Sequence, residues 1–181
     1  MGAAELPQHE SHGADLARVR AAIAHLADPE IPVVSLSELG ILREVRTGAD
    51  GMPEVVITPT YSGCPAMGQI EDDIVAALRD AGLPGRVVTQ LSPAWTTDWM
   101  SEAAKDKLRA YGIAPPQCGS APATSTGVLQ FSRHATRAVQ VPCPQCGSHN
   151  TTQTAHFGST ACKALYRCLD CLEPFDYFKP Y

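Results

Sequence analysis

The chain has 181 residues and a formal net charge of −5, and its 44% apolar and 18% charged residues exclude a disordered protein. No apolar run reaches the roughly 18–20 residues that a membrane-spanning helix needs, and the first residues lack the basic and apolar regions of a secretory signal. These observations predict a cytoplasmic protein with one ordinary domain and a small second module.

Six segments between residues 14 and 115 have the apolar spacing of helices or strands, and a loose tail is expected at residues 1–13. In chain order they are predicted as a helix, two strands, a helix, a strand and a helix, at residues 14–27, 39–46, 54–60, 66–81, 86–91 and 97–111. Glycines follow the last two helices and mark the turn between the first two strands. This order predicts a compact α/β domain.

The composition changes after residue 115. Proline, alanine, serine and threonine are frequent in residues 116–136, as in a linker, and a short β-rich segment follows at residues 137–181. We therefore expect two folded parts, the α/β domain at residues 14–115 and a small β-rich ribbon at residues 137–181.

Four of the seven cysteines form two C-x₂-C pairs, Cys143 with Cys146 and Cys168 with Cys171, separated by 21 residues. Two such turns that face each other supply four thiolates in a tetrahedron, which favours zinc over iron. A closed shell of four thiolates has no open position, so the predicted zinc is structural. Its binding supplies folding energy that so small a module cannot obtain from burial alone.

Cys162 lies six residues before Cys168 and next to Lys163. It could be an exchangeable fifth ligand of the metal or a reactive accessory thiol beside a cation. A small buried packing residue is the more common role of such a cysteine, and it is the interpretation that we favour. Cys118 lies in the linker and has no assigned role.

Cys64 lies at the junction between the second predicted strand and the second predicted helix. Unpaired N–H groups and the helix dipole at a helix N-terminus stabilise an anion, so the thiolate is favoured there. Thr58 and Thr60 lie just upstream and add hydroxyl donors. The position predicts a metal-binding or nucleophilic thiolate.

Asp28 and Glu30 follow the first predicted helix, in a segment that contains two prolines. The prolines stiffen the loop, and polar groups on such loops often carry function. The alternative is that Asp28 caps a turn and Glu30 is solvated, and the sequence does not separate the two. The six histidines are scattered, and no general base or phosphate-binding loop stands out.

Two motifs, DPEIPVVSLSELGIL at residues 28–42 and TPTYSGCPA at residues 58–66, resemble the family of small iron–sulfur cluster assembly and targeting factors. The resemblance covers about residues 14–112 and implies that Cys64, Asp28, Thr58 and Thr60 occupy the family's functional positions. Its implied cargo is iron or an iron–sulfur cluster. Because clusters are usually held by four cysteines, Cys64 would need a homodimer or outside ligands.

Three further motifs, WTTDW at residues 95–99, YGIAPP at residues 111–116 and FGSTACK at residues 157–163, accompany the four-cysteine ribbon. Together they resemble the family of D subunits of phenylacetyl-CoA epoxidase over nearly the whole chain. The resemblance implies a role in aerobic phenylacetate degradation. The implied partners are the di-iron oxygenase and the iron–sulfur reductase of that system.

We therefore predict a maturation factor that handles iron or a cluster at Cys64 for the oxygenase system, with its reductase as the expected client. The chain is not expected to be an enzyme by itself. The main alternative is a stable, non-catalytic subunit, and a third is an enzyme with Cys64 as nucleophile. A nucleic-acid-binding ribbon is disfavoured, because the residues before Arg133 hold nine basic and sixteen acidic side chains.

Overall fold

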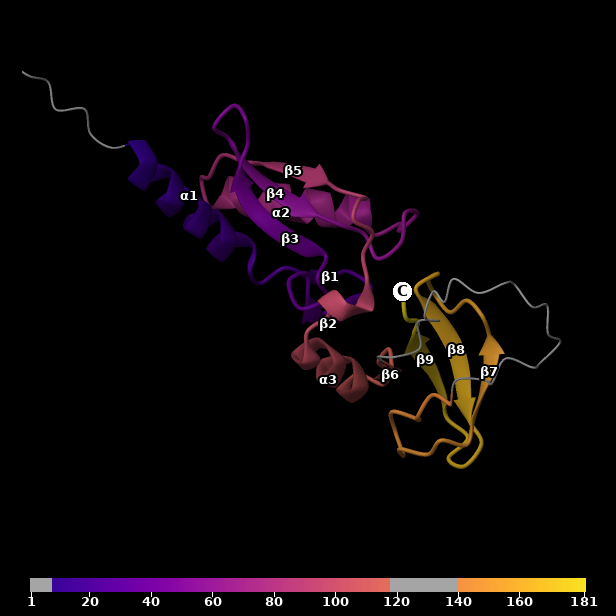
Figure 1. The fold of residues 1–181 in the computed structure, drawn as a ribbon. Coiled ribbons are helices and arrows are strands. Elements are labelled where there is room, and N and C mark those ends of the chain that lie inside the picture. The colour runs from indigo at the N-terminus through magenta and orange to yellow at the C-terminus, as the bar shows by residue number, and fades with distance from the viewer. Residues whose placement is uncertain (1–7, 118–139) are drawn as a thin grey trace, which may run out of the picture. The chain divides into compact units, whose positions relative to one another are not determined.

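The computed structural model describes residues 8–117 and 140–181, with the side chains of residues 8–14 excepted (Figure 1). The chain forms two compact units. The first extends to Ala104, apart from Thr96–Asp98, which belongs with Lys105–Tyr181 in the second. No helix among the described residues is both long and apolar enough to cross a membrane.

The first unit contains a three-stranded sheet with two helices (Figure 1). In chain order its elements are α1 (Gln8–Ile23), β1 (Ala27–Asp28), β2 (Ile31–Ser35), β3 (Leu42–Thr47), β4 (Pro53–Ile57), α2 (Met67–Asp80) and β5 (Arg86–Thr89). β3 and β4 form an antiparallel hairpin, as predicted, while β4 and β5 are parallel and α2 connects them. All five residues of the central strand β4 are buried.

The core of the first unit lies between the sheet and the two helices. α1 and α2 contact each other, and α1 contacts β3 and β4 while α2 contacts β5. The apolar residues of α2 recur four positions apart, at Ile70, Ile74 and Leu78, and each is at most 2% exposed. This spacing places them on one face of the helix, toward the sheet.

Several elements differ from the sequence-based expectations. α1 begins at Gln8 rather than at Ala14, and the short antiparallel pair β1–β2 was not predicted. The helix predicted at residues 97–111 is divided into a 3₁₀ turn, η1 (Thr97–Trp99), and α3 (Glu102–Ala110). Ser101 explains this division, because its hydroxyl accepts the Ala104 N–H at 3.0 Å and so starts a new helix.

The second unit contains the ribbon. Its four-stranded sheet has the order β6–β9–β8–β7 and consists of β6 (Ile113–Ala114), β7 (Thr151–Ala155), β8 (Lys163–Cys168) and β9 (Pro174–Phe178). β7, β8 and β9 are antiparallel neighbours, whereas β6 pairs with β9 in parallel. Residues 113–114, which precede the predicted linker, therefore belong to the ribbon sheet. The linker itself lies mostly outside the described residues, and the predicted domain limits stay a prediction.

The ribbon has a small core of its own. Tyr166 stacks on Phe175 at 5.8 Å between ring centroids and meets the edge of Tyr177 at 5.4 Å. Buried Cys143 and Cys168 belong to the same apolar cluster. The predicted fold class, an α/β domain followed by a β-rich four-cysteine ribbon, is confirmed.

Candidate metal centre and thiol site

The four ribbon cysteines meet around one point. Their Sγ atoms all lie within 4.8 Å of one another, with 3.7 Å between Cys143 and Cys171 and 3.6 Å between Cys146 and Cys168. A tetrahedral metal with bonds of about 2.3 Å to sulfur requires sulfur–sulfur distances of about 3.8 Å, whereas a disulfide requires about 2.05 Å. The arrangement therefore fits a bound metal ion and not disulfides.

Two tight turns, which we call the knuckles, present these thiols. The first knuckle (residues 143–147) precedes β7, and the second knuckle (residues 168–172) joins β8 to β9. In the second, the backbone N–H of Cys171 points at the Sγ of Cys168 at 3.5 Å and lowers the pKa of Cys168 to about 7. At Cys168, the fold thus favours the thiolate form that a metal requires.

Asp170 lies at the tip of the second knuckle, and its carboxylate accepts two side-chain hydrogen bonds. One carboxylate oxygen accepts a 2.7 Å hydrogen bond from the side-chain amide of Asn150, and the other accepts the hydroxyl of Ser148. The hydrogen bond from Ser148, followed by that from Asn150, lowers the pKa of Asp170. These contacts fix the second knuckle against the segment that follows the first.

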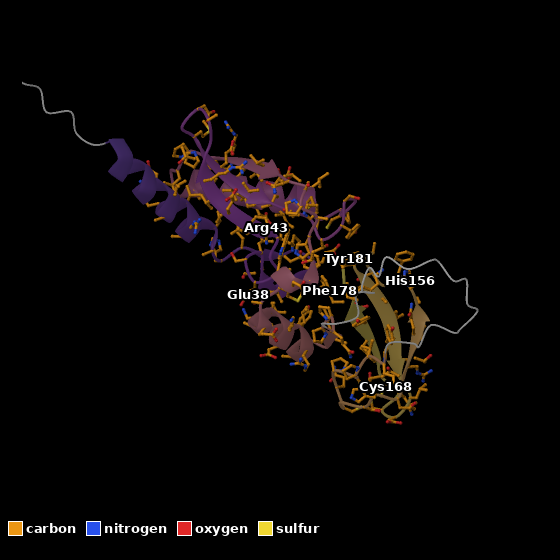
Figure 2. All side chains as sticks on the ribbon, viewed as in Figure 1. Glu38, Arg43, His156, Cys168, Phe178 and Tyr181 are labelled. Atoms are coloured by element: carbon orange, nitrogen blue, oxygen red, sulfur yellow. The ribbon has the colours of Figure 1, made fainter. Side chains whose placement is uncertain are left out.

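Cys162 does not join the metal centre. It precedes β8, whereas Cys168 ends it, and Figure 2 shows Cys168 and His156 near opposite ends of the ribbon sheet. Cys162 is 5% exposed, and its sulfur lies 3.0 Å from the hydroxyl of Thr160. Neighbouring Lys163 forms an ion pair with Asp176 at 3.3 Å. This environment agrees with a packing role for Cys162, and Cys118 lies outside the described residues.

Cys64 lies in the loop between β4 and α2, as its sequence context predicts. It is half-buried, its N–H donates to the carbonyl of Tyr61 at 3.2 Å, and its carbonyl accepts the N–H of Met67 at 3.4 Å. No side chain caps the start of α2 at Ala66, and the first turn holds no acidic residue. The partial positive charge of this helix end is therefore not offset by a carboxylate of its own first turn.

Thr58 and Thr60 follow β4 and are both buried, at 1% and 8% exposure. The backbone N–H of Thr58 donates to the carbonyl of Ile41 at 2.9 Å. Its hydroxyl, by contrast, is buried without a hydrogen-bond partner among the described residues. Because an unsatisfied buried hydroxyl costs about 1–3 kcal/mol, the fold alone does not account for a threonine here.

Asp28 holds the turn between β1 and β2. It is 8% exposed, and its Oδ1 accepts the backbone N–H groups of Glu30 at 2.8 Å and Ile31 at 3.0 Å. This geometry gives Asp28 a structural role, the alternative that the sequence left open. Glu30 is half-buried in the same turn.

Potential metal ligands gather at one place in the part of the chain that the structure describes. The four ribbon cysteines form a group of at least three such side chains, and Cys64, Asp28 and Glu30 do not form another. The described residues therefore do not supply a four-ligand cluster site at Cys64.

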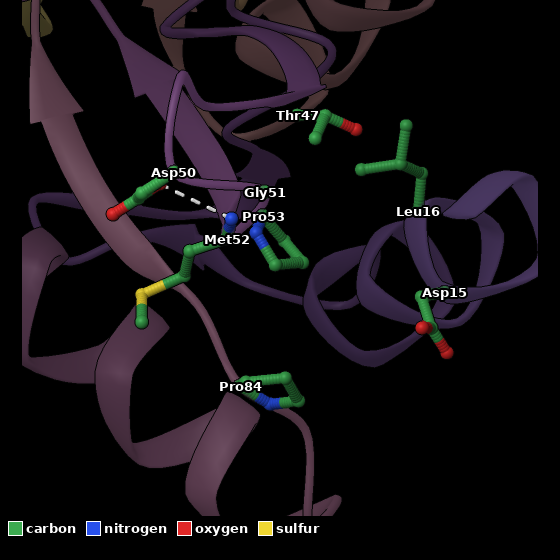
Figure 3. Close-up of a pocket in the computed structure, with 8 residues that line it drawn as sticks. All are labelled: Asp15, Leu16, Thr47, Asp50, Gly51, Met52, Pro53 and Pro84. Carbon is green, nitrogen blue, oxygen red and sulfur yellow. Dashed lines mark hydrogen bonds between the residues drawn. The ribbon is translucent and has the colours of Figure 1, made fainter. Parts of the chain in front are cut away.

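Two hollows were not anticipated from the sequence. One of about 290 Å³ lies beside the first knuckle, where Lys105 and Arg109 accompany several prolines. The spacing of these two cations, four positions apart on α3, was the sequence signal that could have indicated this hollow. The other, of about 280 Å³, lies between α1 and the β3–β4 turn (Figure 3). Its carboxylates are already paired, Asp15 with Arg18 and Asp50 with Arg86, so it is not a site candidate.

The fold and the two sites define an iron–sulfur assembly-type α/β domain joined to a metal-binding ribbon. The family model "Iron-sulfur cluster assembly protein" matches residues 16–92, and the model "PaaD zinc beta ribbon domain" matches residues 129–179. An Escherichia coli protein, provisionally assigned as the D subunit of 1,2-phenylacetyl-CoA epoxidase, is 47% identical over 88% of this chain and 89% of its own length. The chain belongs to the family of phenylacetyl-CoA epoxidase D subunits.

Other relatives match about half of this chain. An Fe–S protein maturation auxiliary factor from Porphyromonas gingivalis is 38% identical over 45% of this chain and 78% of its own length. The crystal structure of a domain of unknown function from Bacillus anthracis is 27% identical, with a TM-score of 0.50. It covers 56% of this chain and 97% of its own. The Porphyromonas gingivalis relative and the family model over residues 16–92 place the α/β domain in the assembly-factor family, and the Bacillus anthracis structure shares its fold.

Proposed function

We propose that this protein is a maturation factor that handles iron or an iron–sulfur cluster for the reductase of the phenylacetyl-CoA epoxidase system. Cys64 is its working thiol. The observation that carries the proposal is the position of Cys64, before a helix end without a side-chain cap, in a domain that matches the assembly-protein family.

The surroundings of Cys64 suit transient binding. The N-terminal N–H groups of α2 stabilise a thiolate, which is the form that binds iron. A single thiolate holds its cargo weakly enough for release, unlike a closed cage of four thiolates. The remaining ligands would come from a second copy of the chain or from the client. Asp28 and Glu30 are the carboxylate candidates, and Thr58 and Thr60 the candidate hydroxyl donors.

The ribbon has a separate task in this proposal. Four thiolates at tetrahedral spacing are the ligand set of structural zinc, which would hold the ribbon folded without taking part in cargo chemistry. The ribbon would then dock the client while Cys64 carries the cargo.

The test is the cofactor content of the reductase. It would be purified from cells that contain the protein, lack it, or carry Cys64→Ser, and its iron and acid-labile sulfide would be measured per polypeptide. We expect a large loss of both without the protein and no rescue by Cys64→Ser. Cys162→Ser, which removes a thiol from the far end of the ribbon sheet, is the matched control and should rescue fully. Full occupancy without the protein would exclude delivery to the reductase.

A stable, non-catalytic component of the oxygenase is the second candidate. The name of the Escherichia coli relative, which makes it part of the epoxidase, and the turn-holding role of Asp28 favour it. It predicts stoichiometric co-purification with the oxygenase and normal activity of the Cys64→Ser complex.

A further inference from the structure

The two knuckles share a backbone turn but differ in the residue that makes it. The residue after the second cysteine is left-handed in both, Gly147 with φ +74° and Leu172 with φ +67°. Leu172 is the one non-glycine residue with positive φ in the described part of the chain. An L-residue is strained in this region because its Cβ crowds the following carbonyl oxygen, and glycine is not.

Packing within the ribbon does not explain the leucine. The side chain of Leu172 is 57% exposed, and that of Leu169, three residues earlier in the same knuckle, is 48% exposed. A single exposed leucine needs no explanation. The second knuckle has two exposed leucines, and one of them has a strained backbone at the position where the first knuckle has glycine. This combination indicates that the leucines serve an interaction with another molecule rather than the fold.

Hydrogen bonds hold the backbone of both leucines in the second knuckle. The N–H of Leu169 donates to the carbonyl of Asn150 at 2.8 Å, and the guanidinium of Arg167 donates to the carbonyl of Leu172 at 3.3 Å. Asp170, between the leucines, is held by two side-chain hydrogen bonds. A contact surface fixed in this way loses little conformational entropy on binding.

The charges around the leucines limit the kind of partner. Within residues 167–173, Asp170 and Glu173 are exposed, and Arg167 is the one basic residue. This mildly acidic rim disfavours nucleic acid and anionic lipid, and it complements a protein pocket with an apolar floor and basic edges.

We propose that Leu169 and Leu172 are the docking contact of the ribbon and insert into a small, basic-rimmed apolar pocket on a protein component of the epoxidase system. The identity of the partner rests on the proposed function. The strain at Leu172 is then retained because glycine would remove the contact.

The test uses the full-length, metal-loaded chain and two measurements, affinity for the purified reductase and oxygenase components and metal retention against a chelator. Leu172→Gly should weaken binding to one component by about tenfold or more, because a leucine that becomes buried in the complex is lost. The same change should slow metal loss a few-fold, because it relieves the strain. A merely structural leucine would not produce these opposite effects.

Two variants separate the effects. Gly147→Ala adds the left-handed strain to the first knuckle, where a Cβ would meet no heavy atom within 4 Å, so it should speed metal loss and leave binding unchanged. Leu169→Ser should weaken binding and leave metal retention unchanged. The inference is overturned if Leu172→Gly and Leu169→Ser bind like the wild type, or if the wild type binds neither component. Because this readout is affinity, it is independent of the iron and sulfide measurement that tests Cys64.

Discussion

Glu54 and Arg86 are register partners on the parallel strands β4 and β5, and two hydrogen bonds of 2.6 and 3.1 Å join the guanidinium to one carboxylate oxygen. On the other side, Arg46 is the register partner of Glu54 on β3, and its Nε donates to the second oxygen at 2.9 Å. One carboxylate thus connects all three strands of the sheet. The hydrogen bonds from Arg46 and Arg86 lower the pKa of Glu54.

We expect Glu54→Gln to lower the urea midpoint of the first unit at pH 7, because an amide cannot replace the charge-assisted bonds. The folded pKa of Glu54 is lowered, so its contribution to stability is present above the ordinary glutamate pKa of about 4.3 and is lost as the pH falls further. The difference between variant and wild type should therefore shrink at about pH 3. The fluorescence of Trp95 and Trp99 can follow the unfolding of the first unit in both proteins, since both residues lie in that unit.

Glu44→Gln is the matched control for that experiment. Glu44 also bonds Arg46, at 2.9 Å, but its side chain is 47% exposed and it contacts no second arginine in the described structure. Exposed pairs contribute little, so its urea midpoint should hardly change. An equal loss in both variants, or a Glu54→Gln loss that is independent of pH, would contradict the role assigned to Glu54.

Gly40→Ala should destabilise the first unit strongly. Gly40 has φ +73°, and a Cβ there would lie 2.7 Å from both the Cβ and the carbonyl oxygen of Trp99. Left-handed strain and overpacking together should cost about 2–4 kcal/mol of unfolding free energy. Gly51→Ala has similar strain, with φ +82°, but no neighbour within 4 Å, so about 1 kcal/mol is expected. Urea titrations of both variants test this, and equal losses would exclude the contact with Trp99 as the cause.

Strong local signals explain what the sequence predicted well. The C-x₂-C pairs identified the metal centre because each ligand pair is contained in one turn. The hairpin of β3 and β4 and the helix α2 have clear periodicity, and their observed bounds lie within three residues of the predicted ones. Cys64 was placed correctly because a strand followed by a Cys-Pro at a helix start is a local pattern.

Features that depend on distant pairing were not predictable. β1 and β6 have two residues each, too few for any period, and β6 acquires its role from β9, where Ile113 pairs with Asp176. The left-handed conformation of Leu172 carries no sequence signal, because leucine does not mark a turn as glycine does. The turn-holding role of Asp28 depends on two N–H groups that only the folded turn brings to it.

Metal removal should unfold the ribbon and spare the first unit. Cys168→Ser removes a ligand that is fully buried, so we expect the full-length chain to lose most of its metal, together with the near-ultraviolet circular dichroism of Tyr166 and Tyr177. Metal content by mass spectrometry and tryptophan fluorescence would be measured in parallel. Cys162→Ser should keep the metal, and its loss in that variant would mean that Cys162 is a ligand after all.

Two substitutions of Asp28 distinguish its role in holding the turn from a role in handling iron. Asp28→Ala leaves the N–H groups of Glu30 and Ile31 without their acceptor and should cost about 1–3 kcal/mol of unfolding free energy. Asp28→Asn keeps a side-chain oxygen at the same position, so its urea midpoint should stay near that of the wild type. We expect Asp28→Asn nevertheless to reduce the iron content of the reductase, because a neutral amide is a poor substitute for a carboxylate at an iron site. A folded Asp28→Asn variant that supports full loading would restrict Asp28 to holding its turn and leave Cys64 to handle the cargo without it.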